Sequence, residues 1–395
     1  MKSIAIIVQK LNGGGAERTA SNLSIILSEY YKVHLLVFDG TNITYPYKGI
    51  LHDLKLPPRK NKILNLLKRI TIIKKIKKKY DISASISLME GANLVNILSK
   101  SSNHETIITS IRNYMSLAQV RNKYFDKHLM QYIARKSNYV VALSKGVEED
   151  LFSNYKIEKN KLKTIYNPVN VKSLNKFYSE SFNENNIIAT MGRLEKQKGQ
   201  WHLIKAMKKV VYYFPNAKLV IYGEGTLKER LINLTEKLNL SQSIIFKGYI
   251  PYPHQHIAKS TIFVFPSLFE GLGNVLLEML ACGVPCIATD CLAGPREILD
   301  DNVIIKQNLK NFELAKYGIL VSVPSGDLDI LDSKLTKEEE QMADAIICLL
   351  KDKSLRENYR KKGLERAADF SYDNISKKWI ELIENQESRN EIEKI

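Results

Sequence analysis

The stretch "SIAIIVQKLNGGGAERTA", residues 3–20, joins an apolar run to a helix-forming segment through three consecutive glycines. The apolar run predicts a buried strand, and the segment after the glycines predicts a helix. A glycine loop at such a junction lets the backbone approach a ligand closely and often holds the phosphates of a nucleotide. The stretch therefore predicts an α/β fold and makes Gly14 and Gly15 candidate binding residues.

The same alternation of apolar and amphipathic segments continues along all 395 residues and is typical of βα units in parallel sheets. Two such series predict two doubly wound, Rossmann-like domains with helices on both faces of each sheet. The polar residues 167–186 are the expected seam, and the site is expected in a cleft between the domains. Strands are expected near residues 3–9, 33–38, 82–88, 105–110, 138–143, 162–166, 186–192, 217–223, 243–248, 261–267 and 284–290.

The composition, 44% hydrophobic and 26% charged residues, excludes the disordered and fibrous classes. No apolar run approaches the ~18 residues of a membrane-spanning helix, and the first residues have neither the cleavage site nor the apolar core of an export signal. We therefore expect a cytoplasmic protein. Cys282, Cys286, Cys291 and Cys348 form neither a disulfide framework nor a zinc-ligand spacing, so buried thiols are expected in place of a metal site.

The net charge of +17 is concentrated in the first half of the chain. Residues 1–170 hold 28 Lys and Arg and 12 Asp and Glu, whereas residues 171–395 hold 31 and 30. Residues 59–79, "RKNKILNLLKRITIIKKIKKK", include ten Lys or Arg and no acidic residue. This segment predicts a basic amphipathic helix that docks on an anionic membrane surface. The expected contact residues are Lys68, Arg69, Lys74, Lys75 and Lys78.

One other interpretation of the basic segment remains open, and a third is disfavoured. Its apolar residues Ile63, Leu66, Leu67, Ile70 and Ile73 share one helical face, so the helix could instead pack on the sheet and present solvated charges. Nucleic-acid binding is not expected, because aromatic stacking residues and a known binding motif are lacking nearby.

Two cations stand close together after the first strand of the second series, in "MGRLEKQKG", residues 191–199. Arg193 and Lys198 flank a turn ahead of a helix, so both could converge on one diphosphate. Each cation taken alone could also be an ordinary solvated charge.

Two glutamates lie in "FEGLGNVLLEML", residues 269–280. Glu270 is expected in the loop before a helix and Glu278 on that helix, where carboxylates can accept hydrogen bonds from sugar hydroxyls while backbone N–H groups face an anion. The alternative is a helix-capping Glu270 and a surface Glu278.

These segments together resemble the retaining glycosyltransferases of family 4, and the resemblance covers nearly the whole chain. It implies the GT-B fold, with an acceptor-side domain at residues 1–168, a nucleotide-sugar domain at residues 169–371, and a last helix, residues 372–395, that packs back on the first domain. The motifs are "GGGAERTA" (13–20), "VVALSKGV" (140–147), "TIYNPVN" (164–170), "MGRLEKQKG" (191–199), "YGEG" (222–225), "FKGY" (246–249) and the two glutamates.

The resemblance also implies roles for single residues. Arg193 and Lys198 would stabilise the departing diphosphate, Glu270 would bind hydroxyls of the transferred sugar, and Gly14 and Gly15 would lie beside the donor phosphates. The remaining donor-binding residues would be Glu278 at the ribose, Gly248, Tyr249 and Ile250 near the base, and Leu272, Gly273 and Asn274 at the sugar and phosphates.

One segment departs from the family pattern. Many relatives have a histidine just beyond the fourth strand, whereas this chain has Arg112 and Asn113 there, which become weak acceptor-side candidates. No cofactor and no metal are expected. The Asp327-Leu328-Asp329 string is of the kind that holds manganese in another class of glycosyltransferase, but we interpret it as coincidence.

The implied reaction moves a hexose or N-acetylhexosamine from a UDP-sugar to a polyprenyl-diphosphate-linked glycan in bacterial polysaccharide, lipopolysaccharide or capsule assembly, at the inner face of the cell membrane. A soluble acceptor is the main alternative. An NAD-dependent oxidoreductase is a distant one: Asp39 could bind a ribose, but Arg18 is too large for the third glycine position. The fourth interpretation, a non-catalytic binding protein, is opposed by the intact cation and glutamate set.

Overall fold

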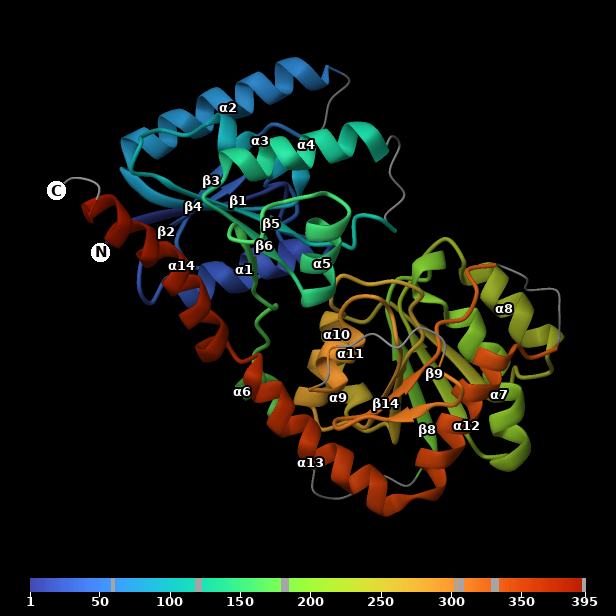
Figure 1. Ribbon diagram of the computed structural model, residues 1–395. Helices are drawn as coiled ribbons and strands as arrows, with labels where there is room; N and C mark the ends of the chain where they lie inside the picture. The colour runs from blue at the N-terminus through green and yellow to red at the C-terminus, as the bar shows by residue number, and fades with distance from the viewer. Residues whose placement is uncertain are drawn as a thin grey trace. The chain divides into compact units, whose positions relative to one another are not determined.

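The computed structural model divides into two compact units (Figure 1). Unit 1 comprises Met1–Pro168 and Tyr372–Ile395, and unit 2 comprises Val169–Ser371. The structure describes residues 1–57, 61–117, 123–178, 185–301, 303, 309–327 and 334–392. Each unit is an α/β layer structure built on a seven-stranded sheet.

Unit 1 has a fully parallel sheet in the order β3-β2-β1-β4-β5-β6-β7. The order reverses between β1 and β4, so the loops that follow these two strands diverge at the carboxyl edge of the sheet. Its elements are β1 (Ser3–Val8), α1 (Gly15–Leu27), β2 (Lys32–Val37), β3 (Ile50–Asp53), α2 (Lys62–Lys79), β4 (Ile82–Leu88), α3 (Glu90–Leu98), β5 (Thr106–Ile111), α4 (Lys123–Lys136), β6 (Tyr139–Ala142), α5 (Lys145–Ser153), β7 (Leu162–Thr164) and α14 (Tyr372–Ile392).

The central strand β1 is buried on both faces because helices cover the sheet on both sides. Ile4 and Ile6 face the cluster formed with α1 and α14, whereas Ala5 and Ile7 face the cluster formed with α2 and α3. This alternation explains why the strand is a continuous apolar run in the sequence.

The last helix of the chain, α14, belongs to the core of unit 1. Trp379 and Ile375 are buried against α1 and the sheet. Tyr372 also donates a hydrogen bond from its hydroxyl to Asn22 Oδ1 at 2.9 Å. The chain therefore returns to unit 1 after completing unit 2 (Figure 1).

Unit 2 has a sheet in the order β10-β9-β8-β11-β12-β14-β13, in which only β13 is antiparallel. The strand order reverses between β8 and β11. Its elements are α6 (Val171–Asn175), β8 (Ile187–Met191), the 3₁₀ turn η1 (Lys196–Lys198), α7 (Gln200–Tyr213), β9 (Lys218–Tyr222), α8 (Lys228–Lys237), β10 (Ile244–Gly248), α9 (His254–Ile257), β11 (Ile262–Phe265), α10 (Asn274–Ala281), β12 (Cys286–Thr289), α11 (Pro295–Leu299), β13 (Glu313–Leu314), β14 (Ile319–Val321), α12 (Lys337–Lys351) and α13 (Lys353–Asp369).

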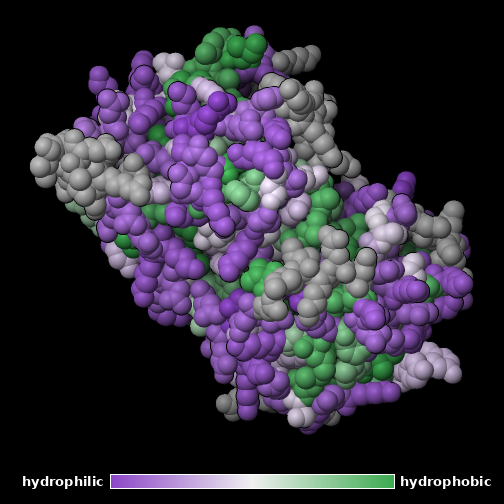
Figure 2. All heavy atoms as spheres, in the orientation of Figure 1, coloured by the Kyte–Doolittle hydropathy of each residue, from purple (hydrophilic) through white to green (hydrophobic). Residues whose placement is uncertain are grey.

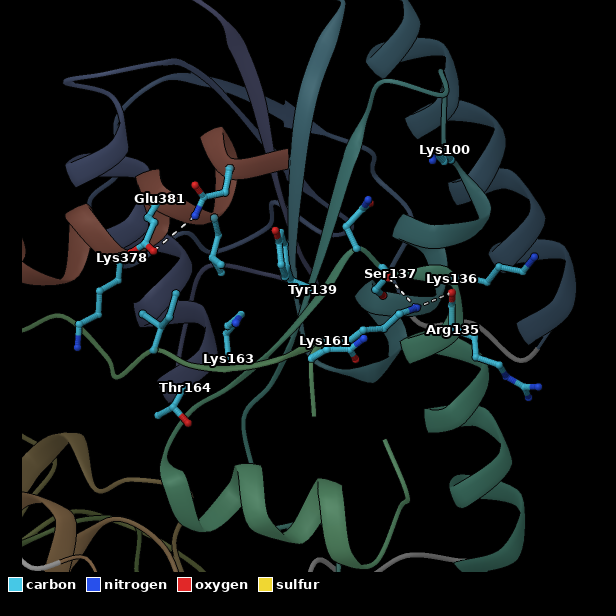
Figure 3. Close-up of a pocket in the computed structure, with 15 residues that line it drawn as sticks. Lys100, Arg135, Lys136, Ser137, Tyr139, Lys161, Lys163, Thr164, Lys378 and Glu381 are labelled. Atoms are coloured by element: carbon cyan, nitrogen blue, oxygen red, sulfur yellow. Dashed lines mark hydrogen bonds between the residues drawn. The ribbon is translucent and has the colours of Figure 1, made fainter. Parts of the chain in front are cut away.

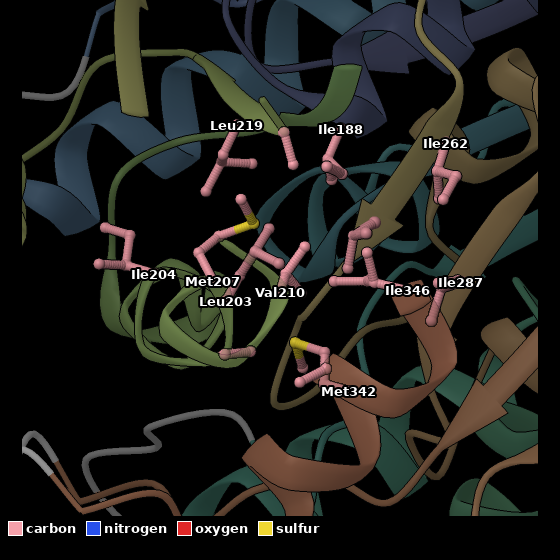
Figure 4. Close-up of a cluster of buried hydrophobic side chains, with 14 of the residues drawn as sticks. Ile188, Leu203, Ile204, Met207, Val210, Leu219, Ile262, Ile287, Met342 and Ile346 are labelled. Atoms are coloured by element: carbon pink, nitrogen blue, oxygen red, sulfur yellow. The ribbon is translucent and has the colours of Figure 1, made fainter. Parts of the chain in front are cut away.

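A large cluster of buried hydrophobic residues in unit 2 lies between its sheet and helices α7 and α12 (Figure 4). Ile188 and Leu219 come from the strands, Met207 and Val210 from α7, and Ile346 from α12, all fully buried. The core fixes the strands whose carboxyl ends carry the candidate site.

The α/β class and the parallel sheets expected from the sequence are confirmed, and each expected strand is present. The strands that sequence patterns missed are β3, β13 and β14, which are short or half-exposed and so lack a long apolar run. Within the described ranges, no helix combines the length and apolar character that crossing a bilayer requires.

Candidate active site

The predicted donor residues of unit 2 follow the carboxyl ends of its parallel strands. The turn after β8 carries Arg193 and Lys198, and the loop after β11 carries Glu270. These two strands flank the point where the strand order reverses, which is where open α/β sheets bind ligands.

Hydrogen bonds and a glycine hold the turn after β8 against the loop after β11. Leu268 donates its backbone N–H to the carbonyl of Gln197 at 2.8 Å, and Gln197 Nε2 donates to the carbonyl of Phe269 at 2.9 Å. Gly199 has φ +61°, and a Cβ there would lie 2.2 Å from the carbonyl oxygen of Pro266. Only glycine fits this close approach. It fixes the start of α7 and the position of Lys198, which directly precedes Gly199.

Lys198 and Glu270 form an ion pair, with 2.5 Å between Nζ and Oε1. Their side chains are 16% and 9% exposed, and the ammonium also lies 5.2 Å from the centre of the Phe265 ring. A cation held in place by a carboxylate and an aromatic face is preorganised to meet an anion with little side-chain entropy left to lose.

Arg193 lies on the same turn but is exposed. In the part of the chain that the structure describes, its guanidinium makes no ion pair, and the carboxylate of nearby Glu195 is hydrogen-bonded to Thr226. Thr226 donates to Glu195 from its backbone N–H at 3.1 Å and from its hydroxyl at 2.8 Å, and these bonds lower the pKa of Glu195. Arg193 is therefore available to a ligand anion.

The amino-terminal end of α10 is shaped by the predicted segment from Leu272 to Asn274. Gly273 occupies the N-cap with φ +95°, and none of the described side chains caps this end of the helix. A Cβ at Gly294 would lie 2.0 Å from the carbonyl oxygen of Leu272, so the two loops touch through backbone. An uncapped helix end presents backbone N–H groups and the positive end of the helix dipole to an anion.

Glu278 lies on α10 and is buried, so the alternative of a surface carboxylate is wrong. Its Oε2 lies 2.9 Å from Nε2 of His254, which is also buried. Sequence reasoning missed His254, because it comes from the short helix α9, 24 positions earlier. Glu270 is not a helix cap either, because Gly273 holds that position.

The segment after β10 places the remaining donor candidates at the same edge of the sheet. Gly248 ends the strand with φ +68° and accepts a hydrogen bond from Gly223 N–H at 2.8 Å. Tyr249 is exposed and Ile250 is half-buried. An exposed aromatic side chain is suited to stack on a base.

In unit 1, the glycine loop sits beside its own switch point, after β1. Gly14 is the N-cap of α1, and Gly15 is the first helical residue. A Cβ at Gly14 would lie 2.1 Å from Oε2 of Glu17, whereas a Cβ at Gly13 would meet nothing within 4 Å. The group that approaches the backbone most closely in this structure is therefore the carboxylate of Glu17, a favourable partner for a helix amino-terminal end.

Arg112 is buried just after β5, and its guanidinium joins segments far apart in the sequence. Nη2 donates to Thr19 Oγ1 at 2.9 Å and to Asn167 Oδ1, and Nη1 donates to Ser110 Oγ at 3.2 Å. Among the described residues no carboxylate pairs with it, and burial lowers the pKa of Arg112 to about 9. Asn113, by contrast, is exposed.

Helix α2 carries the predicted membrane residues, and four of the five are exposed. Lys68, Lys74, Lys75 and Lys78 face solvent. Arg69 instead turns back onto unit 1, where Nη2 donates to the Leu56 carbonyl at 2.6 Å and the guanidinium lies 4.3 Å from the Phe38 ring centre.

The apolar residues of α2 separate into two groups. Ile73 is fully buried, and Leu66 and Ile70 pack against the same cluster. Ile63 and Leu67 are 73% and 56% exposed. In Figure 2 hydrophobic side chains stand out at the top of the view, over the amino-terminal part of α2. The single face expected from the sequence is therefore half buried and half exposed.

The cysteines and the acidic string offer no metal ligands in the described part of the chain. No group of three or more His, Cys, Asp or Glu there could hold a metal ion. The four thiols are free, and burial raises the pKa of Cys282 and Cys291 to about 12. Of residues 327–329, only Asp327 lies within the described residues.

Comparison with known proteins identifies the class. A family model described as "Glycosyltransferase Family 4" matches residues 13–173, and one described as "Glycosyl transferases group 1" matches residues 171–319. An uncharacterised glycosyltransferase of Methanocaldococcus jannaschii is 34% identical over 347 residues, covering 81% of this chain and 83% of that protein. The chain therefore belongs to glycosyltransferase family 4, and it is a glycosyltransferase that uses a nucleotide sugar.

Two further relatives cover almost the whole chain. N-acetylgalactosamine-N,N'-diacetylbacillosaminyl-diphospho-undecaprenol 4-alpha-N-acetylgalactosaminyltransferase of Campylobacter jejuni is 29% identical over 380 residues, covering 94% of this chain and 96% of that protein. The crystal structure of Anabaena HepE in complex with UDP has a TM-score of 0.75 at 17% identity, covering 98% of this chain and 100% of that one. The second likeness shows the GT-B fold.

Proposed function

We propose that this protein transfers a hexose or N-acetylhexosamine, with retention of configuration, from a UDP-sugar to a glycan linked to polyprenyl diphosphate. The observation that carries the proposal is the Lys198–Glu270 pair at the switch point of unit 2, with the exposed Arg193 on the same turn. UDP as the nucleotide is supported by the UDP bound in the similarly folded HepE structure.

The cations of this site are suited to the step in which the sugar leaves its phosphate. The bond between the anomeric carbon and the diphosphate breaks, the sugar becomes oxocarbenium-like, and negative charge accumulates on the diphosphate. Lys198 and Arg193 stabilise that charge more in the transition state than in the ground state. The new bond forms from an acceptor hydroxyl to the same carbon, and the hydroxyl proton passes to the departing diphosphate.

The glutamates and the loop residues bind the donor in this proposal. Glu270 accepts hydrogen bonds from hydroxyls of the transferred sugar while it orients Lys198. Glu278, held by His254, accepts from the ribose hydroxyls. The other donor contacts are Gly14, Gly15, Gly248, Tyr249, Ile250, Leu272, Gly273 and Asn274.

The acceptor side of the proposal rests on two supports. The Campylobacter relative, 29% identical across nearly the whole chain, is named for an acceptor linked to undecaprenol diphosphate. In unit 1, the buried Arg112 donates to Ser110, Thr19 and Asn167 and has no carboxylate partner among the described residues, so its positive charge is not neutralised there, and the exposed Asn113 lies beside it in the chain.

Docking on the inner face of the cell membrane would bring the enzyme to such an acceptor. The exposed lysines of α2 and the exposed Ile63 and Leu67 supply charge and apolar contact together. Each basic residue near an anionic surface contributes about 1 kcal/mol, so four give several kcal/mol at low salt. This favours reversible binding.

The deciding experiment is a panel of nucleotide sugars in which release of the nucleoside diphosphate is measured with and without a polyprenyl-diphosphate-linked glycan. We expect UDP release from one UDP-sugar that depends on the lipid-linked acceptor. Equal release with a soluble glycan would favour the soluble-acceptor alternative. No turnover with any donor would favour a non-catalytic binding role.

Membrane docking is tested separately by flotation with anionic liposomes. The parent protein is expected to float at low salt, and a variant with Lys68, Lys74, Lys75 and Lys78 changed to Glu is expected to remain at the bottom. A control with four exposed lysines of unit 2 changed to Glu should float like the parent. Absence of the parent from the liposome fraction would reject docking without affecting the transferase proposal.

A further inference from the structure

A pocket rich in cations runs along the edge strand β7 of unit 1 and the amino-terminal end of β6 (Figure 3). Its volume is about 940 Å³, at the upper end of the range for small-molecule sites. We call it the basic pocket. Among the described residues its cations are Lys100, Arg135, Lys136, Lys161, Lys163 and Lys378, and its one lining carboxylate is Glu381.

The basic pocket is assembled from segments that lie far apart in the sequence. Lys100 precedes β5, Arg135 and Lys136 end α4, and Lys378 comes from α14 near the end of the chain. In Figure 3, Lys378 and Lys163 lie on the α14 side, and Arg135 and Lys136 on the α4 side. The fold, and not a local basic run, therefore gathers these charges.

Lys161 forms a fixed floor for the basic pocket. Its ammonium donates to the carbonyl oxygens of Ala134 at 3.1 Å, Arg135 at 3.0 Å and Ser137 at 3.4 Å. These carbonyls end α4, where the helix dipole attracts a cation. These three carbonyls take up the three N–H groups of the ammonium and hold the charge in one place, so Lys161 contributes its charge to the pocket and no hydrogen bond.

The five other cations have no carboxylate partner among the described residues, and the local charge is left uncompensated. Glu381 is engaged by Asn385 Nδ2 at 3.5 Å. Lys378 lies 5.8 Å from the centre of the Tyr166 ring, and Arg135 donates only to the Gln131 carbonyl of its own helix. A concave site whose described lining has six cations and one carboxylate attracts anions strongly.

We propose that the basic pocket binds a phosphate ester that carries at least two negative charges. Phosphate oxygens accept several charge-assisted hydrogen bonds, which suits a pocket whose lining residues include six cations. The pocket volume accommodates an organic group beside the phosphates. The residues that line the pocket include none from α2 and none of the proposed donor contacts, so this proposal does not depend on the transferase function.

Calorimetric titration with inorganic pyrophosphate at low salt tests the site. The starting protein carries Arg193→Ala and Lys198→Ala, so that the donor residues do not bind the probe. Adding Lys163→Glu and Lys378→Glu is expected to weaken pyrophosphate binding at least tenfold. Both lysines are exposed, and unchanged thermal unfolding will show that the fold is intact.

A matched control places the same two charge changes on exposed lysines of unit 2, Lys208→Glu and Lys361→Glu. Its pyrophosphate affinity is expected to stay within twofold of the starting protein. An equal loss in the control would show a net-charge effect and overturn the proposal, as would no binding of pyrophosphate to the starting protein.

Sedimentation with phosphatidylglycerol vesicles then identifies the source of the phosphate. If Lys163→Glu and Lys378→Glu also reduce vesicle binding while α2 is unchanged, the ligand is a lipid headgroup. If vesicle binding is unchanged and pyrophosphate binding is lost, the ligand is a soluble phosphate ester.

Discussion

Replacing Lys198 by Ala tests the central claim about the donor site. The substitution removes a cation that lies 2.5 Å from Glu270 and is only 16% exposed. Losing one preorganised electrostatic contact costs about 3–4 kcal/mol, or roughly 100- to 1000-fold in turnover. We expect a loss of that size in kcat for UDP release.

The structure adds a second effect, because Lys198→Ala leaves the Glu270 carboxylate almost buried and without its cation. That charge would repel the donor diphosphate, so KM should rise as well. Glu270→Gln in the Lys198→Ala background removes the repulsion, and the double variant should recover part of the lost affinity. Coupling between two such neighbours is typically about 0.5–3 kcal/mol in a double-mutant cycle.

The assay is steady-state release of nucleoside diphosphate over a range of donor concentrations, with circular dichroism to confirm folding. Lys196→Ala is the matched control, since Lys196 lies on the same 3₁₀ turn but is exposed, and its kinetics should stay near those of the parent. A Lys198→Ala enzyme within about threefold of the parent would refute the role assigned to this cation. Additive effects in the cycle would refute the coupling to Glu270.

Gly14→Val should impair turnover with the fold intact, because the added side chain meets only the mobile end of Glu17; unchanged kinetics in an activity assay would limit the glycine to a role in the turn. Burial and the neighbouring His52 lower the pKa of His34 to about 4, so the fold favours the neutral ring. The contribution of His34 to the free energy of unfolding is fully present above about pH 6.5 and is lost as the pH falls toward 4. The loss is about 2 kcal/mol once solvent screening at the half-exposed His52 is allowed for. Urea unfolding at several pH values measures the slope, and His34→Phe should flatten it. Excess EDTA should leave UDP release undiminished. A loss of UDP release in EDTA that is restored only by adding a divalent metal would contradict the cation-based mechanism.

Local patterns in the sequence were sufficient to predict the strands and the turns that carry the candidate donor residues. Arg193, Lys198 and Glu270 each follow a strongly apolar strand, and the order of parallel strands brings such positions to one edge. Glycine spacing also marked the turns, because Gly199 and Gly273 adopt positive φ values there.

Partners that meet only through the tertiary fold could not be predicted. Arg112 bonds to Thr19 and Asn167, which are 93 and 55 positions away. The basic run of α2 likewise gave no sign that Lys77 is fully buried. Its Nζ lies 2.7 Å from Glu105 Oε1, an ion pair that depends on which face of the helix meets the sheet.

The return of α14 to unit 1 has a consequence for synthesis of the chain. The ribosome synthesises residues 1–168 of unit 1 first. Trp379 and the other α14 residues that complete the core of unit 1 are synthesised only after residues 169–371. At about 5–20 residues per second, that interval lasts roughly 10–40 s. During this interval the apolar face of α1 is not covered by α14. Unit 2 is therefore the first of the two units whose core residues have all been synthesised. Slow translation of the second half should therefore increase the demand of the first half for chaperones.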